Sequence, residues 1–323
     1  MSKYRRLFEP EKGVPAPEVM IDKPQEIDLD DIGVWRHKNN LETIAALTNL
    51  MKPCYCYEPL MQVRIENLQI ESDDGLLPLR IYLPEGKGPH PIMIFIHGGG
   101  WTMNNLDVYD YVPRYFAKYG DILVITPDYR LAPENPFPAA FNDVYNTLVW
   151  TEANALNYGG DISNISLAGD SAGANLAAAA CIASRDRGGP KIKSQILIYG
   201  AYDLRKGERT NSELLYGNGD YFLELNSEEG LCPWYVTQEE DLDNPYVSPL
   251  SSSELENLPA AYFYCGDCDP LLDQNLMYAA KLEDCGNEVE FSLIKGMIHA
   301  FINRPYQKTF ELFDEVIAIL KGD

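Results

Sequence analysis

One stretch decides the fold of this chain: Leu167-Ala168-Gly169-Asp170-Ser171-Ala172-Gly173-Ala174-Asn175. It follows an apolar β-type run over 162–167 and opens a helix of small and apolar residues over 172–184. Ser171 therefore stands where a strand turns directly into a helix. Such a serine needs a strained backbone, and the residues two before and two after it must be nearly free of side chain so that strand and helix can approach. Gly169 and Gly173 meet this need. The Gly-x-Ser-x-Gly pattern alone also fits an ordinary turn, but in this context it predicts a nucleophile elbow.

Length, composition and charge limit the classes of protein to consider. With 323 residues and 46% hydrophobic residues, the chain can form one large α/β domain with an appendage, which we prefer to two domains. The net charge of −23 argues against nucleic acid or an anionic membrane as a partner. No apolar signal core follows the first residues, and no apolar run approaches the roughly 18 residues of a membrane span. Seven cysteines, an odd number, favour a reducing compartment, so we expect a cytoplasmic protein.

Two of the cysteines form a Cys-x-x-Cys motif over 265–268. The motif follows an expected strand and precedes an expected helix, so a redox pair is one interpretation. No second cysteine pair has zinc-like spacing to it. We therefore expect buried thiols rather than a metal site.

From residue 63 the pattern is that of strands. Residues 63–70 and 76–83 alternate apolar and polar side chains around a turn, which predicts an antiparallel pair. Continuous apolar runs separated by helical patterns follow, and these predict a parallel sheet with crossover helices. The further expected strands are 92–96, 122–126, 162–167, 195–199, 260–265 and 289–294, and the expected helices are 107–119, 139–157, 172–184, 271–285 and 306–320. The sheet thus has eight strands, and the elbow follows the fifth, where an α/β-hydrolase fold carries it.

Two segments do not fit this alternation. Residues 1–60 have no β pattern but a helical one over 32–51, which indicates a helical arm. Residues 203–246 contain eleven acids, three bases and six large aromatic residues; a structureless loop of this length is improbable. We expect a helical insertion that joins the arm as a cap above the active site. The predicted division is 1–60 arm, 61–202 first part of the core, 203–246 cap insertion and 247–323 second part of the core.

A serine nucleophile needs a base, usually an imidazole oriented by a carboxylate. In this fold the order along the chain is Ser, then Asp or Glu, then His. The chain has four histidines, of which only His299 follows Ser171. His299 comes just after the last expected strand, where a loop can bring it over the sheet. These positions predict that His299 is the base.

The carboxylate of the triad is less constrained. Asp269 is preferred because Pro270 beside it can start a helix and leave the acid in the loop. Asp267 and Asp203 follow strands in the same way and stay alternatives. Each of the three acids could instead be a helix cap.

Donors for an oxyanion are expected after the third strand, in His97-Gly98-Gly99-Gly100-Trp101. Glycine lets the backbone approach a substrate and leaves its amide bare. Gly98, Gly99 and Gly100 are therefore candidates for the oxyanion hole, together with the amide of Ala172 after the nucleophile. His97 is interpreted as a brace for this loop. Trp101 and Asp170, which adjoin these residues, are the candidate substrate-binding residues.

Taken together, five blocks resemble the bacterial hormone-sensitive-lipase-like branch of the α/β-hydrolases. The blocks occur in the family's order from about residue 60 to the end: 97–101, 128–134 with 137–140, 169–173, 269–271 and 299–301. The resemblance implies that Ser171, Asp269 and His299 form the triad. It also implies an N-terminal helical cap, no cofactor and hydrolysis of esters with short to medium acyl chains. One departure is Ala300, where the family usually has glycine.

The leading hypothesis is a serine carboxylesterase acting on a small ester. A peptidase or amidase on the same triad is an alternative, although no substrate-anchoring domain is visible. A small-molecule receptor is a non-enzymatic alternative, since the fold can keep a pocket and lose catalysis; such a receptor is expected to lack part of the triad. A lipase on long-chain lipids is disfavoured by the charge. A homodimer through an edge strand or the arm is possible on this sequence.

Overall fold

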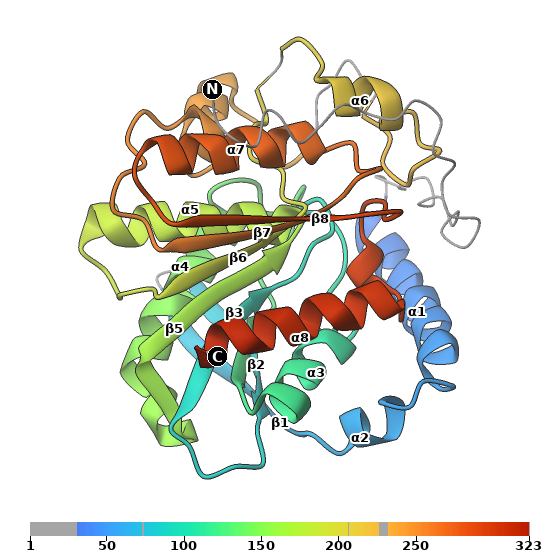
Figure 1. Cartoon of the computed structure of the whole chain (residues 1–323), viewed down its shortest axis with the longest axis vertical. Helices are drawn as coiled ribbons and strands as arrows, with labels where there is room; N and C mark the ends of the chain where they lie inside the picture. The colour runs from blue at the N-terminus through green and yellow to red at the C-terminus, as the bar shows by residue number, and fades with distance from the viewer. Residues whose placement is uncertain (1–30, 73, 206, 226–231, 323) are drawn as a thin grey trace.

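The structure, a computed structural model, describes residues 31–72, 74–205, 207–225 and 232–322. Its centre is one eight-stranded sheet in the order β1-β2-β4-β3-β5-β6-β7-β8 (Figure 1). β2 pairs antiparallel with β1 and β4, and the other neighbours pair in parallel. The eight-stranded, mostly parallel α/β fold is therefore confirmed. The strands are β1 (Arg64–Ser72), β2 (Gly75–Leu83), β3 (His90–Ile96), β4 (Leu123–Pro127), β5 (Gly160–Asp170), β6 (Ser194–Ile198), β7 (Ala260–Gly266) and β8 (Val289–Ile294).

Helices cover both faces of the sheet (Figure 1). Along β3, Ile92, Ile94 and Ile96 belong to one apolar core, and the alternate residues Met93 and Phe95 belong to the other. This alternation follows from the two-residue period of a strand and explains why the run is continuously apolar. The first core includes α4, α5 and α7, and the second includes α3 and α8 with part of α1. The helices are α1 (Ile32–Met51), α2 (Tyr57–Met61), α3 (Tyr111–Gly120), α4 (Ala139–Asn154), α5 (Ala172–Arg187), α6 (Asn211–Tyr216), α7 (Leu272–Asp284) and α8 (Gln307–Lys321), with 3₁₀ turns η2 (Ala155–Tyr158), η3 (Glu239–Asp243), η4 (Pro249–Ser251) and η5 (Phe301–Asn303).

The small side chains of α5 have a packing reason. Residues 172–184 of this helix are all buried, and the helix contacts β3, β5, β6 and α4. A helix enclosed in this way has no polar face, because every side is covered by protein. Its first residue follows Ser171 directly, so this packing also fixes the position of the nucleophile.

The predicted helix over 32–51 is confirmed, but the expectation of a helical insertion at 203–246 is largely wrong. Within the described part of that segment, α6 and η3 are the only helical pieces. The short helix α6 begins at a capping box formed by Thr210 and Glu213. Asn218, Gly219 and Asp220 then form a turn, and the amide of Gly219 donates to the Leu223 carbonyl at 3.0 Å. Turn-forming residues therefore divide the segment where we expected longer helices.

Three smaller points complete the fold. The helix expected from residue 107 begins at Tyr111, because the Asn105 side chain accepts the amides of Asp107 and Val108 in a turn. The part of the predicted arm over residues 1–30 lies outside the described residues. Within the described ranges, none of the helices has the length and apolar character that crossing a membrane requires.

Candidate active site

The nucleophile elbow lies where β5 ends and α5 begins. Ser171 has φ +53° and ψ −120°, a backbone conformation that side-chain-bearing residues rarely adopt and that surrounding structure must hold. Its amide donates to the carbonyl of Ile198 at the end of β6, at 2.9 Å. A Cβ on Gly173 would lie 2.0 Å from the Ile96 carbonyl oxygen, and one on Gly169 would lie 2.5 Å from the backbone of Gly173. The two glycines therefore let β3, β5 and α5 meet beneath the serine.

The structure brings Ser171, His299 and Asp269 into one hydrogen-bonded chain. The Ser171 Oγ and His299 Nε2 lie 2.8 Å apart, and His299 Nδ1 lies 2.9 Å from Asp269 Oδ2. Asp269 is fully buried and His299 is 2% exposed. A carboxylate can only accept, so Nδ1 carries the hydrogen and Nε2 is free to accept from the serine hydroxyl. This arrangement can transfer a proton from Ser171 to His299.

The alternative acids have other partners. Asp267 Oδ1 accepts the amide of Gly296 at 2.7 Å, in the loop that leads to His299. Asp203 lies against the guanidinium of Arg205, at 2.7 and 2.8 Å. Of the three candidate acids, Asp269 is therefore the one that contacts the imidazole.

Two aromatic rings lie beside the His299 imidazole. The Tyr199 ring is 4.7 Å away between centroids and tilted by 58°, and the Phe222 ring is 6.3 Å away and roughly parallel at 27°. Phe222 comes from the 203–246 segment and has φ +82°, which is unusual for a bulky residue. The residue after the histidine, Ala300, also has a left-handed backbone at φ +62°. That conformation explains why glycine suits this position.

The glycine-rich loop begins where β3 ends. Gly99, Gly100 and Trp101 have φ of +126°, +58° and +58°, which is three positive φ angles in succession. Within the described residues, no protein acceptor takes the amide hydrogens of Gly99, Gly100 and Ala172. The Gly98 amide differs, because it donates to Asp170 Oδ1 at 2.8 Å. The expectation that Gly98 contributes an oxyanion donor is therefore wrong, and Gly99, Gly100 and Ala172 stay the candidates.

Asp170 is a structural acid rather than a substrate-binding residue, which corrects the expectation. It is 1% exposed, and its Oδ2 accepts from the hydroxyls of Tyr109 at 2.8 Å and Tyr199 at 3.2 Å. Burial raises the pKa of the Asp170 carboxyl to about 6, and these hydrogen bonds oppose the rise. Through Gly98 the carboxyl joins the elbow to the oxyanion loop. The two tyrosines were missed, since nothing in the sequence around them signals that they meet here.

Trp101 is also part of the packing. It is 2% exposed, and its ring stacks on Tyr235 at 4.7 Å with an angle of 6°. The substrate contact expected of Trp101 stays a prediction. Tyr235 belongs to the 203–246 segment, so the stack attaches that segment to the oxyanion loop.

His97 has the geometry of a brace. Its Nδ1 lies 2.8 Å from the Gly98 carbonyl, and its ring stacks on Tyr129 at 4.3 Å. Burial lowers the pKa of His97 to about 4, so the ring is neutral near pH 7. The Tyr129 hydroxyl in turn donates to the His97 carbonyl at 2.8 Å.

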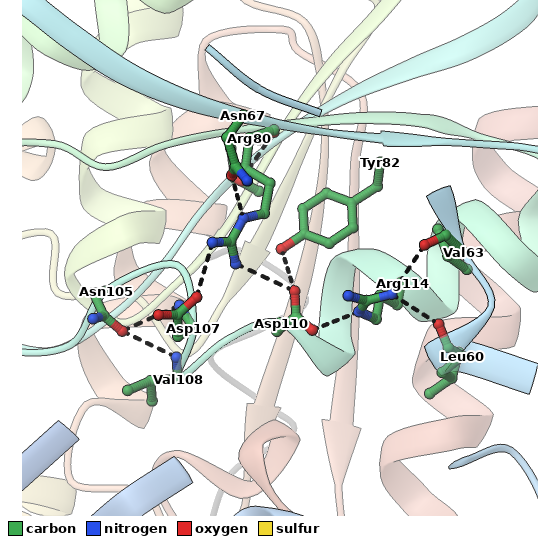
Figure 2. Close-up of polar contacts among 11 residues, drawn as sticks. Leu60, Val63, Asn67, Arg80, Tyr82, Asn105, Asp107, Val108, Asp110 and Arg114 are labelled. Carbon is green, nitrogen blue, oxygen red and sulfur yellow. Dashed lines mark hydrogen bonds and ion pairs between the residues drawn. The ribbon is translucent and has the colours of Figure 1, made fainter. Parts of the chain in front are cut away.

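The far end of the same loop is held by charged side chains (Figure 2). Asp110 lies between Arg80 of β2 and Arg114 of α3 and pairs with both. Arg114 also donates to the carbonyls of Leu60 and Val63, at 3.1 and 3.0 Å. These contacts hold residues 105–114 against the β1–β2 hairpin. They do not reach the oxyanion turn, which we define as residues 99–101.

The cysteines of the Cys-x-x-Cys motif are buried, and Cys268 directly precedes Asp269 in the chain. Cys265 and Cys268 are 0% and 1% exposed and unpaired. Burial raises the pKa of both thiols, so neither is a thiolate near neutral pH.

Comparison with known proteins assigns the family. A family model described as alpha/beta hydrolase fold matches residues 93–303. The chain belongs to this family. It is 36% identical over 300 residues to the carboxylic ester hydrolase LipN of Mycobacterium tuberculosis, covering 90% of this chain and 77% of that one. It is 34% identical to an arylesterase of Saccharolobus solfataricus, over 77% of this chain and 79% of that one.

A solved structure is similar over most of this α/β-hydrolase. The hyperthermophilic esterase of Pyrobaculum calidifontis superposes with a TM-score of 0.79 at 32% identity, covering 88% of this chain and 90% of that one. The resemblance inferred from the motifs is confirmed at the level of the family.

Proposed function

We propose that this chain is a serine carboxylesterase that hydrolyses esters with short to medium acyl chains. The observation that carries the proposal is the hydrogen-bonded chain from Ser171 through His299 to Asp269. Its relatives named esterase or ester hydrolase support the reaction class. The net charge of −23 favours neutral or cationic substrates over anionic ones.

In the proposed mechanism His299 Nε2 takes the hydroxyl proton while Ser171 Oγ attacks the ester carbonyl carbon. The oxyanion forms against the amides of Gly99, Gly100 and Ala172, which are fixed before the reaction. His299 then returns the proton to the departing alcohol, and Asp269 stabilises the imidazolium in between. Water, deprotonated by His299, attacks the acyl-enzyme, and His299 returns that proton to the Ser171 oxygen as the acid is released.

We also propose that residues 1–60 and 203–246 form the cap over this site. The contacts of the second segment support it: Phe222 lies beside His299, and the Cys232 thiol lies 3.1 Å from the Gly100 carbonyl oxygen. The cap would select the acyl and alcohol parts of the ester. The remaining division proposed is 61–202 and 247–323 for the two parts of the core.

The test is hydrolysis of a short aryl acetate by the wild type and Ser171→Ala. We expect Ser171→Ala to lose at least about three orders of magnitude in kcat. Ser163→Ala, an exposed serine of the same strand, is the matched control and should keep full activity. Undiminished turnover by Ser171→Ala would remove this serine from the mechanism.

Further comparisons separate the alternatives. A series from acetate to decanoate esters measures the acyl preference, and a matched ester and anilide separate an esterase from an amidase. Tight ligand binding without turnover would indicate a receptor.

We further propose a cytoplasmic enzyme whose partner is a small-molecule ester, without nucleic acid or membrane. All seven cysteines are unpaired, which supports a reducing compartment. β8 is an edge strand of the sheet, and a homodimer through it would appear as a doubled mass in solution.

A further inference from the structure

The turn that carries the oxyanion donors is strained and needs support from its surroundings. Gly99, Gly100 and Trp101 all have positive φ, and such backbone persists only where neighbouring structure holds it. Inside the turn, the amide of Met103 donates to the Gly99 carbonyl at 2.9 Å. Across the turn, the amide of Ala132 donates to the Trp101 carbonyl at 2.9 Å. The turn is thus paired with the loop around residue 132.

Arg36 of α1 donates hydrogen bonds to both segments, next to the oxyanion turn and in the loop around residue 132. Its Nε donates to the Thr102 carbonyl at 2.8 Å, and its Nη2 donates to the Ala132 carbonyl at 3.0 Å. The same guanidinium pairs with both carboxylate oxygens of Glu134, each at 2.9 Å. The Arg36 side chain is only 15% exposed. A guanidinium offers a rigid fork of donors that can hold several acceptors in one geometry.

The first half of α1 makes few apolar contacts that could replace these hydrogen bonds. Val34 is 64% exposed, and Lys38 extends outward with a side chain that is 70% exposed. The buried apolar residues of α1 are Ile32 in its first turn and Leu47 and Met51 in its last turns, and the latter two belong to the core packed on α3 and α8. Arg36 gives the early turns of α1 a direct polar contact next to the oxyanion turn, through the Thr102 carbonyl.

We propose that Arg36 is a positioning residue for catalysis, because it sets the turn that presents the Gly99 and Gly100 amides to the oxyanion. This rests on the proposed esterase function. Without the guanidinium, the carbonyls of Thr102 and Ala132 lose their donor and the strained turn relaxes. Oxyanion donors act more strongly on the transition state than on the bound ester. The loss should therefore appear in kcat more than in KM.

The experiment compares Arg36→Ala with variants that separate placement of the turn from stability. For an aryl acetate, we expect Arg36→Ala to lower kcat about tenfold with KM changed less than about twofold. Its affinity for a boronic-acid transition-state analogue should fall by a similar factor. Arg36→Lys should recover part of the loss, because an ammonium still donates hydrogen bonds but lacks the planar fork that fits both carbonyls and Glu134 at once. Glu134→Gln keeps both carbonyl contacts and should stay within about twofold of the wild type, since the Glu134 side chain is 44% exposed and an ion pair to an exposed carboxylate contributes little.

Two controls lie on the same helix. Lys38→Ala removes an exposed cation and should change nothing. Leu47→Ala opens a cavity under the end of α1 and should lower Tm while kcat, measured well below Tm, is kept. Wild-type kcat and wild-type analogue affinity in Arg36→Ala, with only a lower Tm as in Leu47→Ala, would overturn the proposal. Failure of the esterase function itself would look different, since the wild type would then be inactive or Ser171→Ala fully active.

Discussion

The buried carboxyl of Asp170 provides a quantitative test of the electrostatics beneath the nucleophile. Asp170→Asn keeps the size of the side chain and an oxygen for the Gly98 amide, but removes the titratable group. In the folded protein burial raises the pKa of Asp170 from 3.8 to about 6. Each tenfold change in acid strength corresponds to about 1.4 kcal/mol, so this rise is worth about 3 kcal/mol of unfolding free energy.

The sign follows from which state holds the proton. Between pH 3.8 and about 6 the folded protein keeps a proton on Asp170 that the unfolded chain has lost. The contribution of Asp170 to the free energy of unfolding is therefore largest at low pH. It is lost as the pH rises through the pKa of Asp170 in the folded protein. Most of this loss falls between about pH 4 and pH 7. Over that range the free energy of unfolding of the wild type should fall by about 2–3 kcal/mol relative to that of Asp170→Asn.

The measurement is urea unfolding of both proteins at half-unit steps of pH, followed by tryptophan fluorescence. The difference between the two unfolding free energies isolates Asp170, because the other titrating groups are shared. A difference that stays constant from pH 4 to pH 7 would refute the reasoning. It would mean that the contacts to Gly98, Tyr109 and Tyr199 fully compensate the burial of the charge.

Three further substitutions test the site. Gly173→Ala would place a methyl group 2.0 Å from the Ile96 carbonyl oxygen. We therefore expect the free energy of unfolding, measured in urea, to fall by at least about 3 kcal/mol. A variant as stable as the wild type would contradict the close packing beneath Ser171. Ala300→Gly relieves a left-handed backbone and should raise the unfolding free energy by about 0.5–1 kcal/mol, whereas a loss would show that the alanine methyl packs usefully. Asp267→Ala removes the acceptor of the Gly296 amide. It should lower the free energy of unfolding by about 1–3 kcal/mol and lower kcat in part. Complete loss of activity would indicate that Asp267 is the carboxylate that orients His299.

Much of the fold was predictable because its signals are local. Continuous apolar runs gave the strands after β2, and β8 over 289–294 matches its prediction. The elbow was readable from Gly169 and Gly173, whose missing side chains the close approach requires. Ser171 and His299 could be placed at one edge because parallel strands end on the same side of a sheet. The choice of Asp269 over Asp267 rested on the family resemblance and on Pro270.

What could not be predicted depends on contacts between distant segments. Burial of Asp170 needs Tyr109 and Tyr199, which lie 61 and 29 residues away in the chain, and the same carboxyl occupies the Gly98 amide. Arg36 meets its carbonyl partners across 66 and 96 residues. For the 203–246 segment the missed signals were local, since the Thr-x-x-Glu pattern at Thr210 marks α6.

In the proposed mechanism, the position of the His299 ring determines the order in which the alcohol leaves Ser171 and water reaches it. The imidazole is held at Nδ1 by Asp269, and the rings of Tyr199 and Phe222 lie beside it, so in the proposed mechanism Nε2 alone exchanges protons with reactants. The alcohol that departs and the water that replaces it must then use the same nitrogen from the same side. The alcohol has to leave before water can arrive, and a second alcohol present in excess would compete for that vacated place and turn hydrolysis into acyl transfer.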